Sequence, residues 1–307
     1  MDKIKIIESV YQKGSQLVVS NPIYKKRVLD FALGRANDDF AFADITSQTL
    51  FSKQKQVKAV IKTQENGMVC GLDEIGLLYH ECGIKFEKLC LDGSLVKRGQ
   101  ILAKVSGNAI KILSLERTVL NILRFLSGIT TTTNKFVQLL NGHSTMIAAT
   151  RKTLAEEYME KRAVSIAGGL THRLGLNNHI MIKDCHLDII GFDKNPIEIS
   201  LKKALSTKYP VEIEVSNLKS AVLAAQIFKH SKQKNPKIIM LDNFLPKDVK
   251  TTLDILKKEK EMIIFESSGG ITLNNIQEYA KTGVDIISTS SLTESSKILN
   301  IHQKIVK

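Results

Sequence analysis

The sequence lacks several features that would place the protein in a membrane or outside the cell. No segment approaches the roughly eighteen consecutive apolar residues of a transmembrane helix. The opening stretch, MDKIKIIESVYQKGSQ, has no apolar core of a secretory signal peptide. Cys70, Cys82, Cys90 and Cys185 form no CxxC pair, which argues against a zinc site and a disulfide framework. We therefore expect a cytoplasmic protein with reduced thiols.

The chain also lacks the arrangement of charge that is typical of nucleic-acid-binding proteins. Its formal net charge is +13, but the lysines are scattered along the whole chain. There is no basic stripe interleaved with aromatic residues and no recognition motif. Nucleic acid is therefore not expected as a partner. Two interpretations of the charge stay open, namely a solvated lysine surface and a field that gathers anionic ligands.

No internal repeat or proline-rich linker separates domains, so the organisation must come from changes in pattern. After a helical stretch at residues 24–34, short β-like runs alternate with glycine-bearing turns between residues 55 and 105. These runs are VKAVIKT, IKFEKLCL and ILAKVSG. The next segment, NAIKILSLERTVLNILRFLSG, has apolar residues at helical spacing. It predicts a long amphipathic helix with Asn108 as its N-cap.

From residue 145 onward, six short apolar runs alternate with amphipathic helical segments. This alternation predicts a parallel sheet with right-handed crossovers, either an open doubly wound sheet or a barrel. The predicted strands are TMIAAT, HIMIKD, VEIEV, KIIMLDN, MIIFESSGG and VDIISTS.

Polar residues follow these predicted strands at the points where the strands end. The carboxyl ends of parallel barrel strands meet at one mouth, whereas a doubly wound sheet brings together only the ends beside its switch point. A barrel with fewer than eight strands would therefore gather all of these residues. They are Arg151, Lys152, Lys183, Asp184, Glu214, Asp242, Asn243, Ser268, Gly269 and Gly270, with His172 and Arg173 from GGLTHRLG.

The residue types at this mouth indicate an anionic substrate. Clustered cations stay charged only if an anion or carboxylates compensate them. The Ser268-Gly269-Gly270 turn precedes the predicted helix ITLNNIQEYA, and such a turn suits a phosphate. Glu214 and Asp242 offer oxygen acceptors for ribose hydroxyls or for a magnesium-bound diphosphate. We expect a phosphorylated, multiply anionic substrate.

The chain resembles a known family, quinolinate phosphoribosyltransferase, which is the decarboxylating nicotinate-nucleotide pyrophosphorylase of NAD synthesis. The resemblance covers residue 26 to the C-terminus. It is carried, in this order, by LERTVLNILRFLSGITTTT, ATRKT, EKRAV, GGLTHRLGL, IKDCH, VEIEV, IMLDN, ESSGGITLNNI and TGVDIIS.

The resemblance implies an N-terminal α/β sandwich domain at residues 1–125 and an incomplete α/β barrel at residues 126–307, with a last helix that packs back on the first domain. It implies a cytoplasmic homodimer, or a hexamer built from such dimers, in which Arg117 enters the neighbouring subunit's site.

The resemblance also assigns ligands. The implied substrates are quinolinate and 5-phosphoribosyl 1-diphosphate, with Mg²⁺ near Glu214 and Asp242, and the implied products are nicotinate mononucleotide, diphosphate and CO₂. Quinolinate would be held by Arg117, Arg151, His172, Arg173 and Lys183. The diphosphate substrate would be held by Lys152, Lys183, Glu214, Asp242, Asn243, Ser268, Gly269 and Gly270, with Lys152, Lys183, Glu214 and Asp242 in the catalytic roles.

The chain departs from the family pattern after Thr-Arg-Lys-Thr, where LAEEYM replaces a loop of the Pro-Gly-Leu-Arg type. Glu156 and Glu157 would weaken dianion binding by roughly 1 kcal/mol if they faced the mouth, and not at all if they faced solvent. Cys185 replaces an asparagine and is interpreted as a buried or neutral replacement. Two alternatives stay open: a paralogue of the same fold with another acceptor, such as the molybdenum-transport-associated type, and a non-catalytic protein that binds phosphoribosyl diphosphate.

Overall fold

The structure is a computed structural model that describes residues 3–39, 43–191, 195–259 and 262–306. It divides into two compact units, each made of separate stretches of chain. The sandwich unit contains Gly14–Asn134, Thr153–Gly168 and the chain from Ser295. The barrel unit contains the chain up to Lys13, Lys135–Lys152 and Gly169–Glu294.

The sandwich unit is built on a four-stranded antiparallel sheet in the order β12-β1-β5-β3. The three strands that the sequence predicted here are confirmed as β1 (Gln56–Thr63), β3 (Lys85–Lys88) and β5 (Ile101–Asn108). A separate two-stranded ribbon joins β2 (Gly67–Met68) to β4 (Leu95–Val96).

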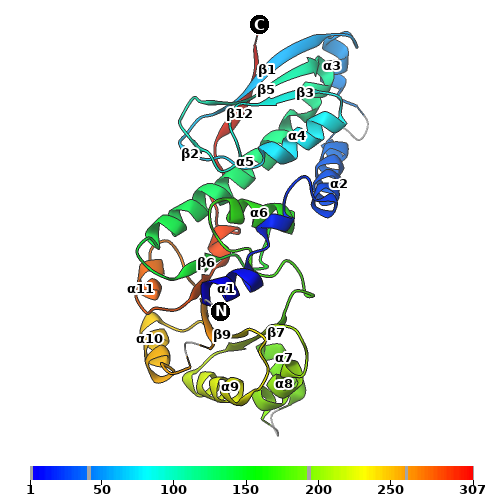
Figure 1. Cartoon of the computed structure of the whole chain (residues 1–307). Coiled ribbons are helices and arrows are strands. Elements are labelled where there is room, and N and C mark those ends of the chain that lie inside the picture. Colours follow the sequence, from blue (N-terminus) through cyan, green and yellow to red (C-terminus); the bar gives the residue numbers. More distant parts are fainter. Residues whose placement is uncertain (1–2, 40–42, 192–194, 260–261, 307) are drawn as a thin grey trace. The chain divides into compact units, whose positions relative to one another are not determined.

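Helices cover this sheet on one side, where α4 (Leu72–Glu81) and α5 (Ala109–Leu139) lie against it (Figure 1). The predicted N-cap of the long helix is confirmed, because Asn108 Oδ1 accepts a hydrogen bond of 3.1 Å from the Lys111 backbone N–H. The helical stretch predicted before the sheet is α2 (Pro22–Asp39). The unit also contains α3 (Ile45–Leu50), α6 (Glu157–Ile166) and the 3₁₀ turn η1 (Gly14–Gln16).

The barrel unit is built on a six-stranded parallel sheet in the order β6-β11-β10-β9-β8-β7. All six predicted strands are present: β6 (Met146–Ala148), β7 (Ile180–Ile182), β8 (Val211–Val215), β9 (Lys237–Asp242), β10 (Ile264–Ser268) and β11 (Ile286–Ser288). An isolated parallel bridge between Ala148 and Leu170 extends the sheet beyond β6. This is the incomplete barrel that the sequence predicted.

Helices lie around the outside of these strands (Figure 1). They are α7 (Asp184–Ile190), α8 (Pro196–Leu205), α9 (Leu218–His230), α10 (Pro246–Ile255) and α11 (Ile276–Ala280), and the 3₁₀ turn η2 (Ser290–Leu292) follows β11. The N-terminal helix α1 (Lys3–Tyr11) also belongs to this unit. Its buried Ile7, Val10 and Tyr11 join the core formed by Ile238, Ile264 and Ile286.

Two details differ from the expected organisation. The last segment was expected to be a helix, and this is wrong, because it is the strand β12 (Ile301–Val306) paired with β1. The expected division at residues 125 and 126 falls inside α5, whose residues up to Asn134 belong to the sandwich unit. The four cysteines are free thiols, as expected. Within the described residues, no helix combines the length and the apolar character that crossing a bilayer requires.

Candidate active site

A pocket of about 570 Å³ opens at the carboxyl ends of the parallel strands in the barrel unit. Every residue that the sequence predicted at the barrel mouth, apart from Asp184, lines this pocket. Arg117 belongs to the other unit, on α5. The predicted residues in its lining are Arg151, Lys152, His172, Arg173, Lys183, Glu214, Asp242, Asn243, Ser268, Gly269 and Gly270.

The cations of the pocket differ in burial. Arg151 and Lys152, which follow β6, are exposed, whereas His172 and Arg173 are only 3% and 7% exposed. The Arg173 Nη1 atom donates to the His179 backbone oxygen at 3.4 Å. The pocket therefore combines buried basic groups in its wall with exposed cations at its rim.

Two pocket residues have backbone conformations that side chains rarely adopt. Among the described residues other than glycine, positive φ angles occur at His172 (57°) and Asn243 (58°). This conformation costs about 1 kcal/mol or more, and it persists where surrounding contacts enforce it. Such residues cluster at functional sites, so both positions support this pocket as the active site.

A lysine and two carboxylates face one another at the ends of β7, β8 and β9. Lys183 Nζ lies 2.7 Å from Glu214 Oε2. Burial opposes the charge of Lys183, but the hydrogen bond and the charge of Glu214 outweigh it and raise the lysine pKa. Burial and the charge of Glu214 raise the pKa of Asp242. The neighbouring carboxylates of Glu214 and Asp242 can accept hydrogen bonds from hydroxyl groups or bind a divalent cation.

The Gly-Gly turn follows β10 directly, but its expected position at the start of a helix is wrong. Helix α11 begins only at Ile276, so the turn does not form a helix N-terminus. Gly269 and Gly270 have φ angles of 97° and 63°. A Cβ atom on Gly269 would lie 2.2 Å from the Asn243 side-chain oxygen. The close approach of these two segments requires glycine here.

A layer of buried ionisable groups lies beneath the pocket, inside the barrel. Glu212 and Glu266 are fully buried, and burial together with the charge of Glu266 raises the pKa of Glu212 to about 8. Burial also acts to raise the pKa of Glu266, but the charge and hydrogen bond of His172 outweigh it and lower that pKa. Glu212 Oε2 lies 2.7 Å from His179 Nε2. Of the two carboxyl groups, Glu212 is therefore the one that keeps its proton at neutral pH.

The same layer contains the one group of potential metal ligands found among the described residues, formed by His172, His179 and Glu212. The 2.7 Å contact between His179 and Glu212 has the length of a direct hydrogen bond. A coordinated ion would have to separate these two atoms. We therefore interpret the group as a hydrogen-bonded network.

Sequence reasoning missed some of the pocket and, apart from His172, the residues of this buried layer. Thr272 and the segment Ser288–Ser291 also line the pocket. The run Ser288–Ser291 begins at the last residue of β11 and is polar, like the other residues predicted at the strand ends. For Glu212 and Glu266, the signal was a carboxylate flanked by apolar residues within a buried strand.

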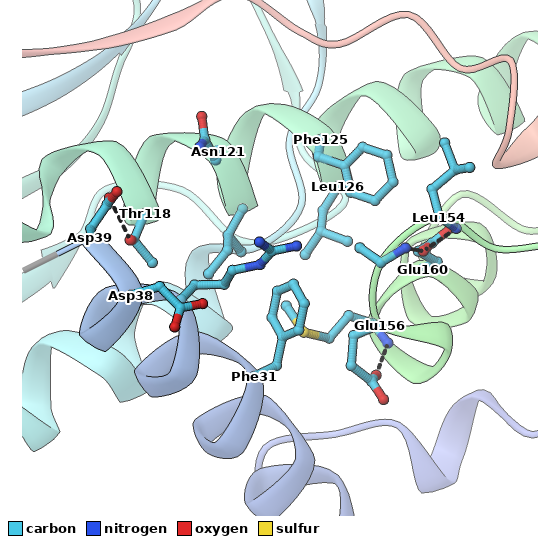
Figure 2. Close-up of a pocket in the computed structure, with 14 residues that line it drawn as sticks. Phe31, Asp38, Asp39, Thr118, Asn121, Phe125, Leu126, Leu154, Glu156 and Glu160 are labelled. Carbon is cyan, nitrogen blue, oxygen red and sulfur yellow. Dashed lines mark hydrogen bonds between the residues drawn. The ribbon is translucent and has the colours of Figure 1, made fainter. Parts of the chain in front are cut away.

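A second cavity, of about 380 Å³, lies in the sandwich unit and is lined by α2, α5 and α6 (Figure 2). Its wall is largely apolar, with Phe31 and Phe125 among the lining residues. One cation, Arg35, is accompanied in the lining by four carboxylates, which are those of Asp38, Asp39, Glu156 and Glu160. An anionic substrate would be repelled here, so the barrel pocket is the better candidate for the active site.

The two glutamates of the LAEEYM segment have structural partners within the sandwich unit. Glu156 Oε2 caps α6 by accepting the Tyr158 and Met159 backbone N–H groups at 2.8 and 3.0 Å, and Glu156 Oε1 accepts from Arg27 Nε at 2.7 Å. Glu157 Oε1 lies 3.2 Å from Lys161 Nζ. Each added negative charge is compensated by a neighbouring cation, which removes the main reason to expect weaker dianion binding.

Comparison with known proteins agrees with the geometry of the barrel pocket. The model of the quinolinate phosphoribosyl transferase C-terminal domain matches residues 129–304, and that of the N-terminal domain matches residues 44–127. A probable nicotinate-nucleotide pyrophosphorylase [carboxylating] of Methanocaldococcus jannaschii is 40% identical over 276 residues, covering 88% of this chain and 94% of that protein. The nicotinate-nucleotide pyrophosphorylase [carboxylating] of Mycobacterium leprae is 33% identical over 265 residues, covering 84% and 89%.

Solved structures give the same result. The nicotinate-nucleotide pyrophosphorylase of Francisella tularensis has a TM-score of 0.79 and 31% identity, covering 92% of this chain and 96% of that one. The Ehrlichia chaffeensis enzyme has a TM-score of 0.81 and 26% identity, covering 90% and 98%. With both domain models matched in order along one chain, this protein belongs to the quinolinate phosphoribosyl transferase family.

Proposed function

We propose that this chain transfers the phosphoribosyl group from 5-phosphoribosyl 1-diphosphate to quinolinate. The reaction releases diphosphate and CO₂ and gives nicotinate mononucleotide. The single observation that carries the proposal is the barrel pocket, where buried and exposed basic groups adjoin a pair of carboxylates and a Gly-Gly turn. The relatives' names supply the reaction, and the pocket supplies a matching group for each part of the two substrates.

The proposed quinolinate ligands are the cationic residues of the pocket. Arg151, His172, Arg173 and Lys183 offer donors to the two ring carboxylates, and an arginine fork can bind a carboxylate through two parallel hydrogen bonds. The buried position of Arg173 fixes one such donor in advance. Binding the dianion among these groups orients its ring nitrogen toward the anomeric carbon of the second substrate.

The proposed ligands of phosphoribosyl diphosphate lie on the other strand ends. Lys152 and Lys183 would contact the diphosphate, Asn243 and the Ser268-Gly269-Gly270 turn would hold the 5′-phosphate, and the carboxylates of Glu214 and Asp242 would accept the ribose hydroxyls. As the bond to diphosphate breaks, positive charge develops on the ribose ring. Glu214 and Asp242 would stabilise this charge electrostatically.

The proposed cofactor is Mg²⁺ bound to the diphosphate. The residues fit it, because the carboxylates of Asp242 and Glu214 line the same pocket and oxygen ligands suit this ion. When bound, Mg²⁺ would neutralise charge on the leaving diphosphate. After transfer, the quaternised ring nitrogen stabilises the carbanion left by loss of CO₂, and that carbon takes a proton from water.

We extend the proposal to the assembly, which would be a cytoplasmic homodimer. Arg117 is exposed on α5 of the sandwich unit. The proposed role of Arg117 is to complete the quinolinate site of a second copy.

Product analysis tests the proposed reaction. Purified protein with phosphoribosyl diphosphate, Mg²⁺ and quinolinate should release CO₂ and form nicotinate mononucleotide, whereas nicotinate should give no product. Turnover of another acceptor in place of quinolinate would favour the paralogue. Binding of phosphoribosyl diphosphate by calorimetry without any turnover would favour a non-catalytic protein.

A further inference from the structure

The N-terminal helix α1 closes the end of the barrel opposite the pocket. Its Ile7, Val10 and Tyr11 pack with Ile264 and Ile286, which are the first residues of β10 and β11. The pocket, in contrast, is lined by residues at the other ends of these strands, such as Ser268 and Ser288. The last residue of the helix, Tyr11, is fully buried.

The Tyr11 hydroxyl reaches the buried layer beneath the pocket. It donates to Glu266 Oε2 at 2.6 Å, while the Ser288 hydroxyl donates to the other oxygen, Oε1. The Tyr11 ring meets the His172 imidazole edge-on, with ring centres 4.6 Å apart and an interplanar angle of 81°. Tyr11 therefore contacts both the imidazole and the carboxylate beside it.

The His172 imidazole is held on two sides. Its Nδ1 atom is hydrogen-bonded to the Arg173 backbone N–H at 2.8 Å. Nε2 lies 3.4 Å from Glu266 Oε1. Since His172 also lines the pocket, Glu266 connects Tyr11 to a residue that a substrate can touch.

The backbone around His172 is tied to the same helix. The Thr171 hydroxyl donates to the Tyr11 backbone oxygen at 2.7 Å and accepts the Lys13 backbone N–H at 2.9 Å. These bonds anchor Thr171, the residue that precedes His172. The φ angle of His172 itself is 57°. A residue with such a backbone conformation depends on surrounding contacts to hold it there.

We propose that Tyr11 is a positioning residue for the reaction: through Glu266 and its ring contact, it fixes the orientation of the His172 imidazole that receives quinolinate. Tyr11 does not line the pocket and touches no substrate. This inference rests on the proposed function for its substrate, but the state of the imidazole can be measured without turnover.

The experiment compares Tyr11→Phe, which removes only the hydroxyl, with two controls. Ile7→Val removes a methylene from the buried face of the same helix, and Tyr79→Phe removes the hydroxyl of another buried tyrosine, which donates to Gln303 Oε1 at 3.0 Å in the sandwich unit. If Tyr11 served only packing, Ile7→Val would have the same effect as Tyr11→Phe.

In Tyr11→Phe, the KM for quinolinate should rise about tenfold, as expected for the loss of one hydrogen bond to a charged network. The KM for phosphoribosyl diphosphate and kcat should change by less than about twofold. Both controls should leave the KM for quinolinate within about twofold of the wild type.

The second readout is the ¹⁵N NMR spectrum of the imidazoles in the ligand-free protein, with the His172 signals assigned by their loss in His172→Gln. Tyr11→Phe should shift the Nε2 and Nδ1 signals of His172, and neither control should. Unchanged His172 signals in Tyr11→Phe, or the same shift in Ile7→Val, would overturn the proposal. If the wild type did not use quinolinate, the proposed function would fail while the NMR comparison still decided the role of Tyr11.

Discussion

At the scale of single residues, the pocket depends on backbone conformations that few side chains tolerate. His172 and Asn243 both have positive φ angles, and Gly269 approaches Asn243 so closely that no other residue fits between them. The strand β10 and the loop after β9 are joined here, because the Asn243 backbone N–H donates to the Ser268 oxygen at 2.8 Å. The shape of the proposed phosphate subsite is therefore set by main-chain contacts.

Gly269→Ala tests this arrangement. The new Cβ would lie 2.2 Å from Asn243 Oδ1 and 2.9 Å from its backbone nitrogen, at a φ angle of 97°. We expect the KM for phosphoribosyl diphosphate to rise by about tenfold or more, and the free energy of unfolding to fall by about 1–3 kcal/mol. Gly99→Ala is the matched control, since Gly99 has a φ angle of 85° but nothing within 4 Å of the added Cβ. Equal effects of the two variants on this KM would contradict the account.

A pH effect on stability is expected from a buried cluster in the sandwich unit. Arg162 lies 2.6 to 2.9 Å from Asp73, Glu74 and Asp92, so one positive charge faces three carboxylates. Burial raises the pKa of Glu74 from 4.5 to about 7. The folded protein then holds an extra proton between these pH values, and this group's contribution to the free energy of unfolding falls as pH rises through that range.

Urea unfolding of the wild type and of Glu74→Gln from pH 4.5 to pH 8 measures this contribution. The free energy of unfolding of the variant, relative to that of the wild type, should rise by up to about 3 kcal/mol as the pH rises from the unfolded pKa of Glu74 to 7. Above pH 7 the difference between the two proteins should stay constant. A difference that is independent of pH would show that Glu74 keeps the same charge in the folded and unfolded states.

The sequence predicted the residues at the strand ends because their position depends only on strand direction and on polar residues that follow apolar runs. Arg151, Lys183 and Asp242 came from this pattern. The buried partners could not be found in this way, because Tyr11 and Glu266 are 255 positions apart. Only the folded barrel brings the phenol and the carboxylate together.

At the scale of elements, the two kinds of sheet were predicted with different success. The six parallel strands are short apolar runs with a clear local pattern, and all six were found. The strand β12 has a mixed sequence, IHQKIV, and its pairing with β1 joins residues from 238 (Thr63 and Ile301) to 248 (Lys58 and Val306) positions apart. A strand that is stabilised mainly by a distant partner gives little local signal.

Removal of β12 should destabilise the sandwich unit. A chain that ends at Leu299 loses the buried Ile301, the partner of the Tyr79 hydroxyl, and the pairing that covers β1. We expect the free energy of unfolding to fall by about 3 kcal/mol or more, with aggregation through the uncovered edge of β1. Urea unfolding and light scattering measure both effects. A chain that ends at Lys304 keeps Ile301 and Gln303 and should lose much less, so similar losses in the two truncations would argue against this role of β12.

At the scale of the whole molecule, the proposed sharing of Arg117 between subunits can be tested by mixing two inactive variants. Arg117→Ala should lack the residue given to the neighbour, and Arg151→Ala should lack a residue of its own pocket. After subunit exchange at equal concentrations, half of the dimers are mixed and each mixed dimer has one intact site. Activity should then return to about a quarter of the wild-type value.

The rate of product formation before and after exchange measures this recovery, with each variant mixed with itself as the control. Recovery would support a site completed in trans. If both variants were inactive alone and their mixture remained inactive after verified exchange, Arg117 would act within its own chain.

The interleaved path of the chain has a consequence for synthesis in the cell. The barrel unit needs both α1 and β11, which lie more than 270 positions apart, and the sandwich unit needs β12, which follows β11 in the sequence. The barrel core cannot close until β11 has left the ribosome, and the sandwich core cannot close until β12 has left it. Apolar strands such as β8 and β9 therefore remain exposed to solvent during translation. The nascent protein should depend on chaperones that bind such segments.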